Sequence, residues 1–312
     1  MPNKIERFIG SFIGLAVGDA VGVTLEFKAP GTFEPIDDML GGGPFNLPIG
    51  YWTDDTSMAL CLAQSLVCCK GFDAQDQMKL YTRWYRKGYM SSLGYCFDIG
   101  GTVEAALEVF ESTGNPYSGS KDPFSAGNGS LMRLCPVPLF YSRYPEKAIH
   151  MSGESSRTTH GTQEAVDACR YFEGLLVGAI NGVGKEELLN NCYSPIGKIT
   201  RDTCVSEKIL QVAQGSFKNH NPPNIKGTGY VVNSLEAALW AFYHGKSYRE
   251  GLLLAVNLGD DADTTGAIYG QLAGAYYGIK EIPEKWSNNI VERKLIEDLA
   301  IQLYESNINL EL

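Results

Sequence analysis

The chain has 312 residues, of which 44% are hydrophobic, and its formal net charge is −10 at pH 7. This length and composition predict a globular protein with a large buried core. Lys and Arg residues are scattered along an acidic chain and form none of the basic patches that a phosphate backbone requires, which excludes nucleic acid as an expected partner.

The first predicted element is a helix over residues 4–18. Glu6 and Arg7 precede an apolar series with a period near 3.6 residues, so the segment is interpreted as a helix of the mature protein rather than a signal peptide. A later uncharged stretch, 264–279, is shorter than the ~20 residues that a membrane crossing needs, and it is interpreted as a core helix. The sequence therefore predicts no membrane segment.

The cysteine pattern bears on the cellular compartment of the protein. The chain has 8 of them, with no CxxC spacing, and several, such as Cys61 and Cys169, fall at apolar positions of helical patterns. We interpret them as buried free thiols, which predicts a cytoplasmic protein.

Helical periodicity recurs along the chain, while strand patterns are almost absent. Glycine-rich and proline-rich connectors over 28–50, 113–130 and 217–230 separate the helices, and long loops of this kind in compact domains tend to be functional. We expect an all-α protein, a compact single-domain helical bundle over 1–312 whose long loops converge on a site. The predicted helices cover 4–18, 56–70, 74–87, 101–112, 162–180, 185–191, 205–215, 231–244, 247–256, 264–278 and 291–304.

The helix predicted over 264–278 carries glycine at every fourth position, at Gly266, Gly270, Gly274 and Gly278. Glycine inside a helix costs up to ~1 kcal/mol relative to alanine. The stripe therefore predicts a close backbone approach to another helix.

Two aspartate-rich segments, YWTDDTSMAL and NLGDDADTTG, lie about two hundred residues apart, and each opens a predicted helix. Taken singly, each suits a helix N-cap, because Asp and Thr accept hydrogen bonds from the first turn and acidic groups complement the helix dipole. Brought together, their carboxylates and hydroxyls would form an oxygen-only site for two divalent cations. With no Cys or His in either segment, such a site favours Mg²⁺, Mn²⁺ or Ca²⁺ over zinc. The candidate metal ligands are Thr53, Asp54, Asp55, Asp261, Asp263 and Thr264.

Three further carboxylates stand next to glycine-bearing turns. Asp19, in GLAVGDAVGVTLEF, suits a cap or a brace of the turn, and Glu26 is of interest only if it enters the acidic site. Asp98 precedes Gly100 and Gly101 at a predicted helix start. That arrangement suits either an N-cap or a carboxylate that binds sugar hydroxyls beside amides that bind an anion.

The segment SAGNGSLMR contains a short polar loop, Gly127, Asn128, Gly129 and Ser130, ahead of apolar residues. Such a loop forms either a plain turn or a cradle of main-chain amides for phosphates. His160 lies between cap residues and a predicted helix, where it is either structural or part of a pocket wall.

Taken in chain order, GDAVGVTLEF, WTDDTSMAL, FDIGGTVEAAL, GNGSLMR, THG, NSLEAALWAF and NLGDDADTTGAIYGQLAGAYYG resemble the ADP-ribosylglycohydrolase family. This family includes the dinitrogenase reductase-activating glycohydrolases and the ADP-ribosylarginine hydrolases. The resemblance spans about residues 5 to 290, and the order of the motifs makes it more specific than any single one. It implies an all-α fold with a dinuclear magnesium or manganese centre at the bottom of an ADP-ribose cleft.

The resemblance also implies roles for individual residues. Glu26 matches an acidic residue near the metals, and Asp98 matches a carboxylate that contacts the ribose or the leaving group. Many relatives have glycine at the position of Asp260, so Asp260 is expected to be a neighbour of the site rather than a ligand. The implied metal ligands are the six named above, and the implied substrate-binding residues are Asp98, Gly127, Asn128, Gly129, Ser130 and His160.

The implied reaction is hydrolysis of the N-glycosidic bond between C1″ of ADP-ribose and an acceptor side chain of a protein, most simply arginine. Asp55 or Glu26 is the candidate general base, and Asp98 or Glu26 is the candidate group for the leaving guanidine. The expected substrate is an ADP-ribosylated protein, the expected product is ADP-ribose, and the chain is expected to act as a monomer. Two alternatives stay open: a hydrolase of another ADP-ribose linkage, to serine, a polymer or an acetyl ester, and a non-catalytic protein that binds ADP-ribose or a transferase.

Overall fold

The computed structural model describes residues 2–204 and 206–311, and within these ranges it contains fourteen α-helices, four 3₁₀ helices and no β-strand. Because the described residues form helices and no strand, the predicted all-α fold is confirmed. The helices surround one hydrophobic core. Residues 1 and 312, the ends of the predicted domain, and residue 205, where one predicted helix begins, lie outside the described residues. In chain order the elements are α1 (Lys4–Gly22), η1 (Val23–Leu25), α2 (Asp54–Cys69), α3 (Ala74–Lys87), α4 (Gly101–Thr113), η2 (Pro123–Ser125), α5 (Pro136–Tyr141), α6 (Pro145–Arg157), α7 (Gln163–Ile180), α8 (Lys185–Leu188), α9 (Glu207–Ala213), η3 (Ser216–Lys218), α10 (Val231–His244), α11 (Tyr248–Val256), α12 (Ala262–Tyr277), η4 (Ile279–Glu281), α13 (Glu284–Asn289) and α14 (Arg293–Asn309).

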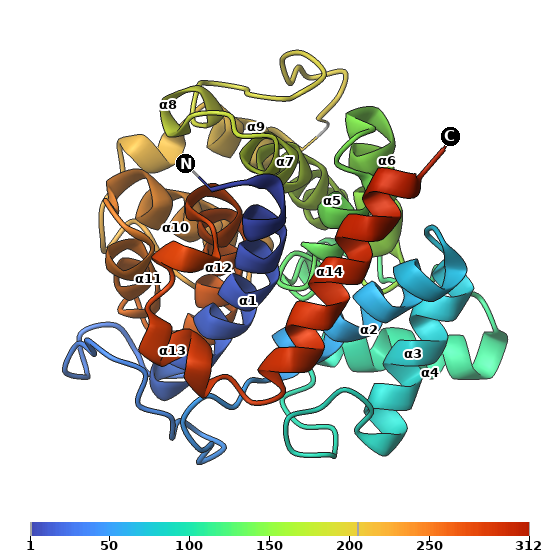
Figure 1. Cartoon of the computed structure of the whole chain (residues 1–312), viewed down its shortest axis with the longest axis horizontal. Coiled ribbons are helices and arrows are strands. Elements are labelled where there is room, and N and C mark those ends of the chain that lie inside the picture. The colour runs from blue at the N-terminus through green and yellow to red at the C-terminus, as the bar shows by residue number, and fades with distance from the viewer. Residues whose placement is uncertain (1, 205, 312) are drawn as a thin grey trace.

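Two helices from opposite ends of the chain, α1 and α12, lie side by side through the middle of the molecule (Figure 1). A Cβ atom added to any glycine of their contact would lie within 2.4 Å of a backbone carbonyl oxygen of the other helix. The close approach predicted from the glycine spacing is therefore confirmed, although Gly278 ends α12 with φ 80° instead of extending the stripe. The facing pairs are Gly10 with Gly274, Gly14 with Gly270, and Gly18 with Gly266.

The segment Lys4–Leu25 is long and apolar enough to cross a membrane by length and composition, but 89% of its apolar window is buried inside the protein. It forms the central core helix of the fold, packed against α12 and α14. The helix predicted over 4–18 is confirmed, and it continues for one more turn, to Gly22.

Arg7 brings a charged group into this core. Its Nη1 atom donates to the carbonyl oxygens of Ala179, Ala275 and Tyr276 at 3.0, 3.0 and 2.8 Å. These carbonyls belong to the last turns of α7 and α12, where carbonyl groups lack the i+4 amide of a continuing helix. The guanidinium therefore ties the ends of two helices to the start of α1.

Three observed helices, α5, α6 and α13, have no counterpart among the predicted ones. α5 and α6 begin at Pro136 and Pro145, which resemble loop residues in a sequence but are favourable at the first helical position. α6 also contains serines and a glycine, residues of low helix propensity, and α13 is only 6 residues long. These segments lack the long apolar period that identifies the other helices.

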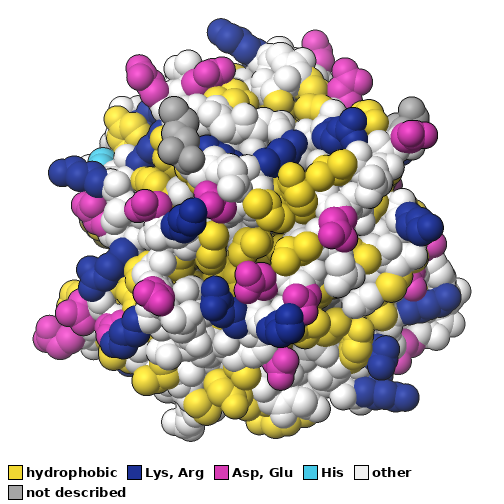
Figure 2. All heavy atoms as spheres, viewed as in Figure 1, with side chains coloured by type: hydrophobic (Ala, Val, Ile, Leu, Met, Phe, Trp, Pro, Cys, Tyr) yellow, Lys and Arg dark blue, Asp and Glu magenta, His cyan; other side chains and the backbone are white. Residues whose placement is uncertain are grey.

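The face drawn in Figure 2 carries Lys and Arg side chains interspersed with Asp and Glu, and hydrophobic side chains lie between them. This distribution agrees with the scattered charges of the sequence.

The two acidic segments begin their helices slightly earlier than predicted, at Asp54 for α2 and at Ala262 for α12. Asp54, Asp55 and Asp263 therefore lie in first helical turns, and Thr53 and Asp261 occupy the N-cap positions. Both helix starts face the end of α1, which contacts α2 and α12. The starts of α2 and α12 and the end of α1 therefore meet in one region of the fold.

Candidate active site

Asp19, near the end of α1, is fully buried and holds the start of α2. Its carboxylate accepts hydrogen bonds from the Thr53 N–H at 3.0 Å, the Thr53 hydroxyl at 3.1 Å, the Thr56 N–H at 3.1 Å and the Thr56 hydroxyl at 2.6 Å. Free N–H groups of a first helical turn need such acceptors. Asp19 therefore positions the turn that carries Asp54 and Asp55.

The second acidic segment reaches the same turn. The Thr53 hydroxyl oxygen lies 3.2 Å from Asp55 Oδ2 and 3.4 Å from Asp263 Oδ2, and the Thr264 hydroxyl oxygen lies 3.3 Å from Asp55 Oδ2. Each hydroxyl has a single proton to donate. The fold therefore brings the two acidic segments together, with more carboxylate oxygens than the hydroxyls can satisfy.

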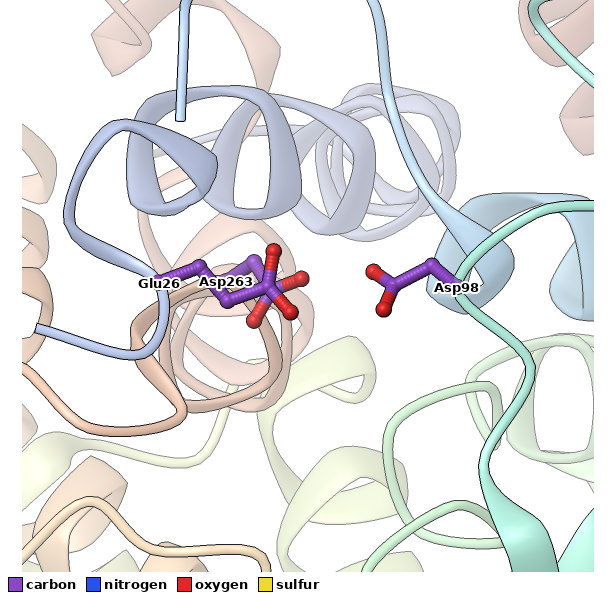
Figure 3. Close-up of side chains that lie close together, drawn as sticks. All are labelled: Glu26, Asp98 and Asp263. Carbon is purple, nitrogen blue, oxygen red and sulfur yellow. The ribbon is translucent and has the colours of Figure 1, made fainter. Parts of the chain in front are cut away.

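Glu26 and Asp98 complete the acidic cluster. One carboxylate oxygen of Glu26, one of Asp98 and one of Asp263 all lie within 4.8 Å of one another. Figure 3 shows Glu26 and Asp263 pointing together toward Asp98, which comes from the opposite side. Glu26 follows η1, and Asp98 belongs to the loop before α4, with φ 58° in the left-handed region.

The cluster opens into a cavity of about 290 Å³. Asp54, Asp98, Asp261, Asp263, Thr264 and Glu26 line it, together with Gly127, Asn128, Gly129 and His160. The start of α4 also lines it, through Gly100, Gly101 and Thr102. Thr53 and Asp55 are buried behind the lining, and Ser130 is buried with its hydroxyl 2.8 Å from that of Ser156.

The glycine-rich loop packs against His160. A Cβ atom at Gly127 would lie 3.2 Å from His160 Nε2, and one at Gly129 would lie 2.9 Å from Cε1, so both positions need a small residue. The amide of Asn128 donates to Asp261 Oδ2 at 2.9 Å, which links the loop to the acidic cluster. Burial, reinforced by Arg133, lowers the pKa of His160 to about 3, so its ring is neutral at pH 7.

Asp260 lies outside this cavity. Its φ of 54° is left-handed, a conformation that glycine adopts readily. Its N–H donates to Lys28 O at 2.8 Å, and its carbonyl accepts from the Phe27 N–H at 2.7 Å. Asp260 therefore acts through its backbone, as a neighbour of the acidic cluster.

The sequence predicts only a local cap or brace for Asp19, whereas its hydrogen bonds run to another helix. The signal was present as an aspartate inside an apolar helical pattern. Gly229, which also lines the cavity, follows a Gly-Thr turn whose sequence points only to a loop.

The carboxyl groups of the cluster repel one another and are poorly solvated. Burial and neighbouring carboxylates raise the pKa of Glu26 to about 10 and that of Asp98 to about 8. Burial first, and then neighbouring carboxylates, raise the pKa values of Asp54, Asp55 and Asp263 well above their usual range. Among the described residues, those lining the cavity include no Lys or Arg.

The donor set fits divalent metal ions. In residues 2–204 and 206–311, Glu26 Oε2 and Asp55 Oδ1 are buried oxygens without a hydrogen-bond partner. Buried carboxylates are stable when they are paired or coordinate a metal. An arrangement of carboxylate and hydroxyl oxygens suits Mg²⁺, Mn²⁺ or Ca²⁺.

The raised pKa values predict an unusual pH dependence of the metal-free protein. The folded state binds protons at Glu26 and Asp98 more tightly than the unfolded chain does, so the free energy of unfolding falls as the pH rises from about 4 toward the folded pKa values of about 8 and about 10. In EDTA, the melting temperature should therefore fall between pH 5 and pH 9. Saturating MgCl₂ or MnCl₂ should remove most of this fall, and an equal fall with and without the cation would contradict the prediction.

Asp19→Asn is expected to weaken divalent-cation binding by about 10- to 100-fold, the usual effect of losing an outer-shell partner of metal ligands. The amide keeps one acceptor oxygen where the carboxylate serves four donors, and its NH₂ group meets N–H groups of α2. Calorimetric titration with Mn²⁺ measures the affinity, and far-UV circular dichroism checks the fold. Thr56→Val, which removes one of the four donors, is the milder control. Unchanged Mn²⁺ affinity in Asp19→Asn would show that α2 is positioned without it.

These features define a class of protein: an all-helical chain in which a buried, oxygen-only acidic cluster forms one end of a cavity, beside a glycine-rich loop and a helix N-terminus. The chain belongs to the ADP-ribosylglycohydrolase family, whose sequence model matches residues 1–310. The predicted family is thus confirmed.

Individual relatives extend this comparison. The chain is 41% identical to ADP-ribosylarginine hydrolase Tri1 of Pseudomonas putida (strain GB-1) over 303 residues. The aligned region covers 97% of this chain and 79% of that protein. It is 30% identical to the ADP-ribosyl-[dinitrogen reductase] glycohydrolase of Rhodospirillum rubrum over 304 residues, and the aligned region covers 94% of each protein. A solved structure described as an ADP-ribosylglycohydrolase-related protein complex superposes with a TM-score of 0.85 at 44% identity, covering 97% of this chain and 99% of that one.

Proposed function

We propose that this protein is a divalent-cation-dependent hydrolase that releases ADP-ribose from arginine side chains of modified proteins. The observation that carries the proposal is the convergence of carboxylates from α1–η1, α2, the loop before α4 and α12 on one cavity, with buried oxygens that lack partners. The arginine linkage is supported by the names of relatives at 41% and 38% identity, both called ADP-ribosylarginine hydrolase.

The residues that would hold two Mg²⁺ or Mn²⁺ ions are those of the two helix starts. When bound, such cations supply positive charge that orients sugar hydroxyls and lowers the pKa of water. They would also relieve the repulsion that raises the carboxyl pKa values of the cluster. The proposed ligands are Thr53, Asp54, Asp55, Asp261, Asp263 and Thr264.

Cleavage of the N-glycosidic bond develops positive charge at C1″ of the ribose, and the guanidine must leave protonated. The carboxylates of the cluster favour that positive charge. Asp98, less buried than Glu26 and Asp263, is suited to donate the proton that the guanidine nitrogen takes as its bond to C1″ breaks, and Glu26 is suited to take a proton from the attacking water. Asp98→Asn should then lose more activity on an arginine conjugate than on a conjugate with a more acidic leaving group, whereas Glu26→Gln should lose activity on both.

The diphosphate of the substrate needs positive potential in a protein of net charge −10. The N-terminus of α4 lines the cavity through Gly100 and Gly101, and a helix N-terminus attracts anions through its free N–H groups and its dipole. The Gly127–Asn128–Gly129 loop lies on the same cavity. These main-chain groups are the proposed anion-binding part of the site.

All eight cysteines, each in the described part of the chain, are free thiols, but the predicted burial holds for only four of them, and Cys68 and Cys69 are exposed. Free thiols are typical of reducing compartments, and we therefore propose that the protein acts in the cytoplasm. That it acts as a monomer stays a prediction.

The test is release of free ADP-ribose from arginine-modified and from serine-modified protein, each with Mg²⁺, with Mn²⁺ and with EDTA. Release from the arginine conjugate only, and only with a cation, is expected. Release from the serine conjugate alone would assign a different linkage. No release from either under any metal condition would leave a non-catalytic binding protein as the better explanation.

A further inference from the structure

A second and larger hollow, of about 980 Å³, lies against the catalytic cavity. The loop after η1, the loop before α10 and the helices α10 and α11 surround it. Most of its lining side chains are apolar, and we call it the apolar groove. Its lining includes Pro30, Pro223, Ile225, Trp240, Leu253 and Leu254.

Three chain segments that hydrogen-bond to one another separate the groove from the catalytic cavity. They are residues 27–28, 227–229 and 260–261. Thr228 lines the groove while the next residue, Gly229, lines the cavity, and the same holds for Asp260 and Asp261. The segments are joined by the Asp261 N–H to Gly227 O at 2.8 Å and by the Phe27 and Asp260 bonds described above. The groove and the cavity therefore share one wall.

Phe27 belongs to this wall and exposes 69% of its surface. It lines the catalytic cavity with φ 58°, and Pro30, three residues later, lines the groove. An exposed aromatic side chain beside an apolar hollow is typical of an interaction surface. Phe27 thus adds exposed apolar surface at the catalytic cavity, three residues from the groove-lining Pro30.

The chemistry of the proposed reaction places the substrate protein at this wall. The leaving group is an arginine of a polypeptide, and Glu26 and Asp98 are the carboxylates proposed to act at the bond that breaks. Glu26 is followed directly by Phe27 and then by the groove-lining Pro30. A polypeptide that carries the bound arginine and leaves the cavity past Phe27 would therefore pass next to the groove.

The charges of the groove indicate what kind of segment fits. Two basic residues, Lys226 and Arg249, and two acidic ones, Glu250 and Asp260, line it together with the apolar side chains. These charges balance, so no ionic selection of either sign is expected. An apolar segment matches the lining best.

We propose that the apolar groove binds the substrate protein itself, through apolar residues that flank the ADP-ribosylated arginine. This inference rests on the proposed hydrolase function and adds to it a determinant of substrate choice. ADP-ribose would occupy the cavity, the modified arginine would cross the wall near Phe27, and its apolar neighbours would lie against Leu253 and Leu254.

The test compares three defined substrates: ADP-ribosylarginine itself, a synthetic peptide with ADP-ribosylarginine between leucines, and a matched peptide with glycine and serine in place of the leucines. The wild-type protein is expected to show a kcat/KM about tenfold higher on the leucine peptide than on the glycine–serine peptide, with little dependence on salt. Leu254→Glu should abolish this preference and leave turnover of ADP-ribosylarginine unchanged. Val109→Glu, which introduces the same charge at an apolar position 44% exposed on α4, away from the groove, is the control and should keep the preference. Unchanged turnover of ADP-ribosylarginine checks that the partly buried Leu254 tolerates its own substitution.

The outcomes separate the two proposals. Equal kcat/KM on both peptides, with normal turnover of ADP-ribosylarginine, overturns the docking groove and leaves the hydrolase function standing. No turnover of any of the three substrates by the wild-type protein overturns the hydrolase function and the docking proposal with it. A wild-type dimer that Leu254→Glu converts to a monomer, measured by light scattering, would assign the groove to self-association instead and overturn substrate docking.

Discussion

Asp261→Ala is expected to lower kcat by about three orders of magnitude or more, and Asp54→Ala by a similar factor, while the helical fold persists. Both carboxylates line the catalytic cavity, and each is a proposed ligand of the divalent cations. A metal centre contributes several kcal/mol to the stabilisation of a charged transition state, which corresponds to this loss of rate. Initial rates of ADP-ribose release from an arginine conjugate, at saturating Mn²⁺, measure the effect.

A stability measurement in EDTA distinguishes loss of a metal ligand from loss of the fold. Burial raises the pKa of both groups, and neighbouring carboxylates add to this rise for Asp54, so removing either one relieves an unfavourable interaction of the metal-free protein. Both variants should therefore melt at or above the wild-type temperature in EDTA and gain less stability from Mn²⁺. Asn128→Ala, which removes the side-chain hydrogen bonds to Asp261 and to the carbonyl of Thr228 but keeps both carboxylates, is the milder control. Full activity in either aspartate variant would remove that residue from the proposed centre.

Gly18→Ala is expected to destabilise the protein by about 3 kcal/mol or more, as overpacking of a close helix contact does. Helix propensity alone predicts the opposite sign, because alanine is better than glycine in a helix interior by about 1 kcal/mol. Here the added Cβ atom would lie 2.0 Å from the carbonyl oxygen of Gly266, and a backbone oxygen cannot move aside as a flexible side chain can. Urea denaturation followed by circular dichroism measures the change.

The matched control is Gly184→Ala, because a Cβ atom there meets no other atom within 4 Å in the described structure. Gly184 is the exposed N-cap residue of the short helix α8, so the effect of this substitution should be about 1 kcal/mol or less, the usual cost of a poor N-cap residue. Gly18→Ala should also reduce activity under conditions where the variant stays folded, since Asp19 is the adjacent residue. A Gly18→Ala protein as stable as the wild type would mean that α1 and α12 separate at little cost.

Much of the fold could be predicted because most of its helices bury one apolar face and therefore show that period in the sequence. The predicted bounds of α3 and α10 coincide with the observed ones, at 74–87 and 231–244. The helices α5, α6 and α13 could not be found this way. α5 and α13 have only 6 residues each, and α6, with 13 residues, begins with proline and contains small polar residues that hide its apolar period.

The candidate site was predictable as a set of residue types but not as a geometry. The six proposed ligands stand out in the sequence because carboxylates and hydroxyls cluster at two helix starts, and Asp98 stands out because it precedes two glycines. Glu26 is singled out only by the family resemblance. The roles of Asp19 and Asp260 could not be predicted from residue type, because they depend on which distant groups these residues contact. The Asp19 side chain accepts hydrogen bonds from the start of another helix. Asp260, although the more conspicuous charge in the sequence, forms backbone hydrogen bonds with residues 27 and 28.

The helical class, the family resemblance and the oxygen-rich chemistry can be predicted from the sequence, because they depend on local periodicity, ordered motifs and residue type. Tertiary contacts alone bring the starts of α2 and α12 to the end of α1, place Asp98 opposite Glu26 and Asp263, and give the apolar groove and the catalytic cavity a common wall. These relations join residues far apart in the chain, such as Glu26 and Asp263. They depend on how closely α1 and α12 can pack, which the glycine spacing suggests but only the three-dimensional contact fixes.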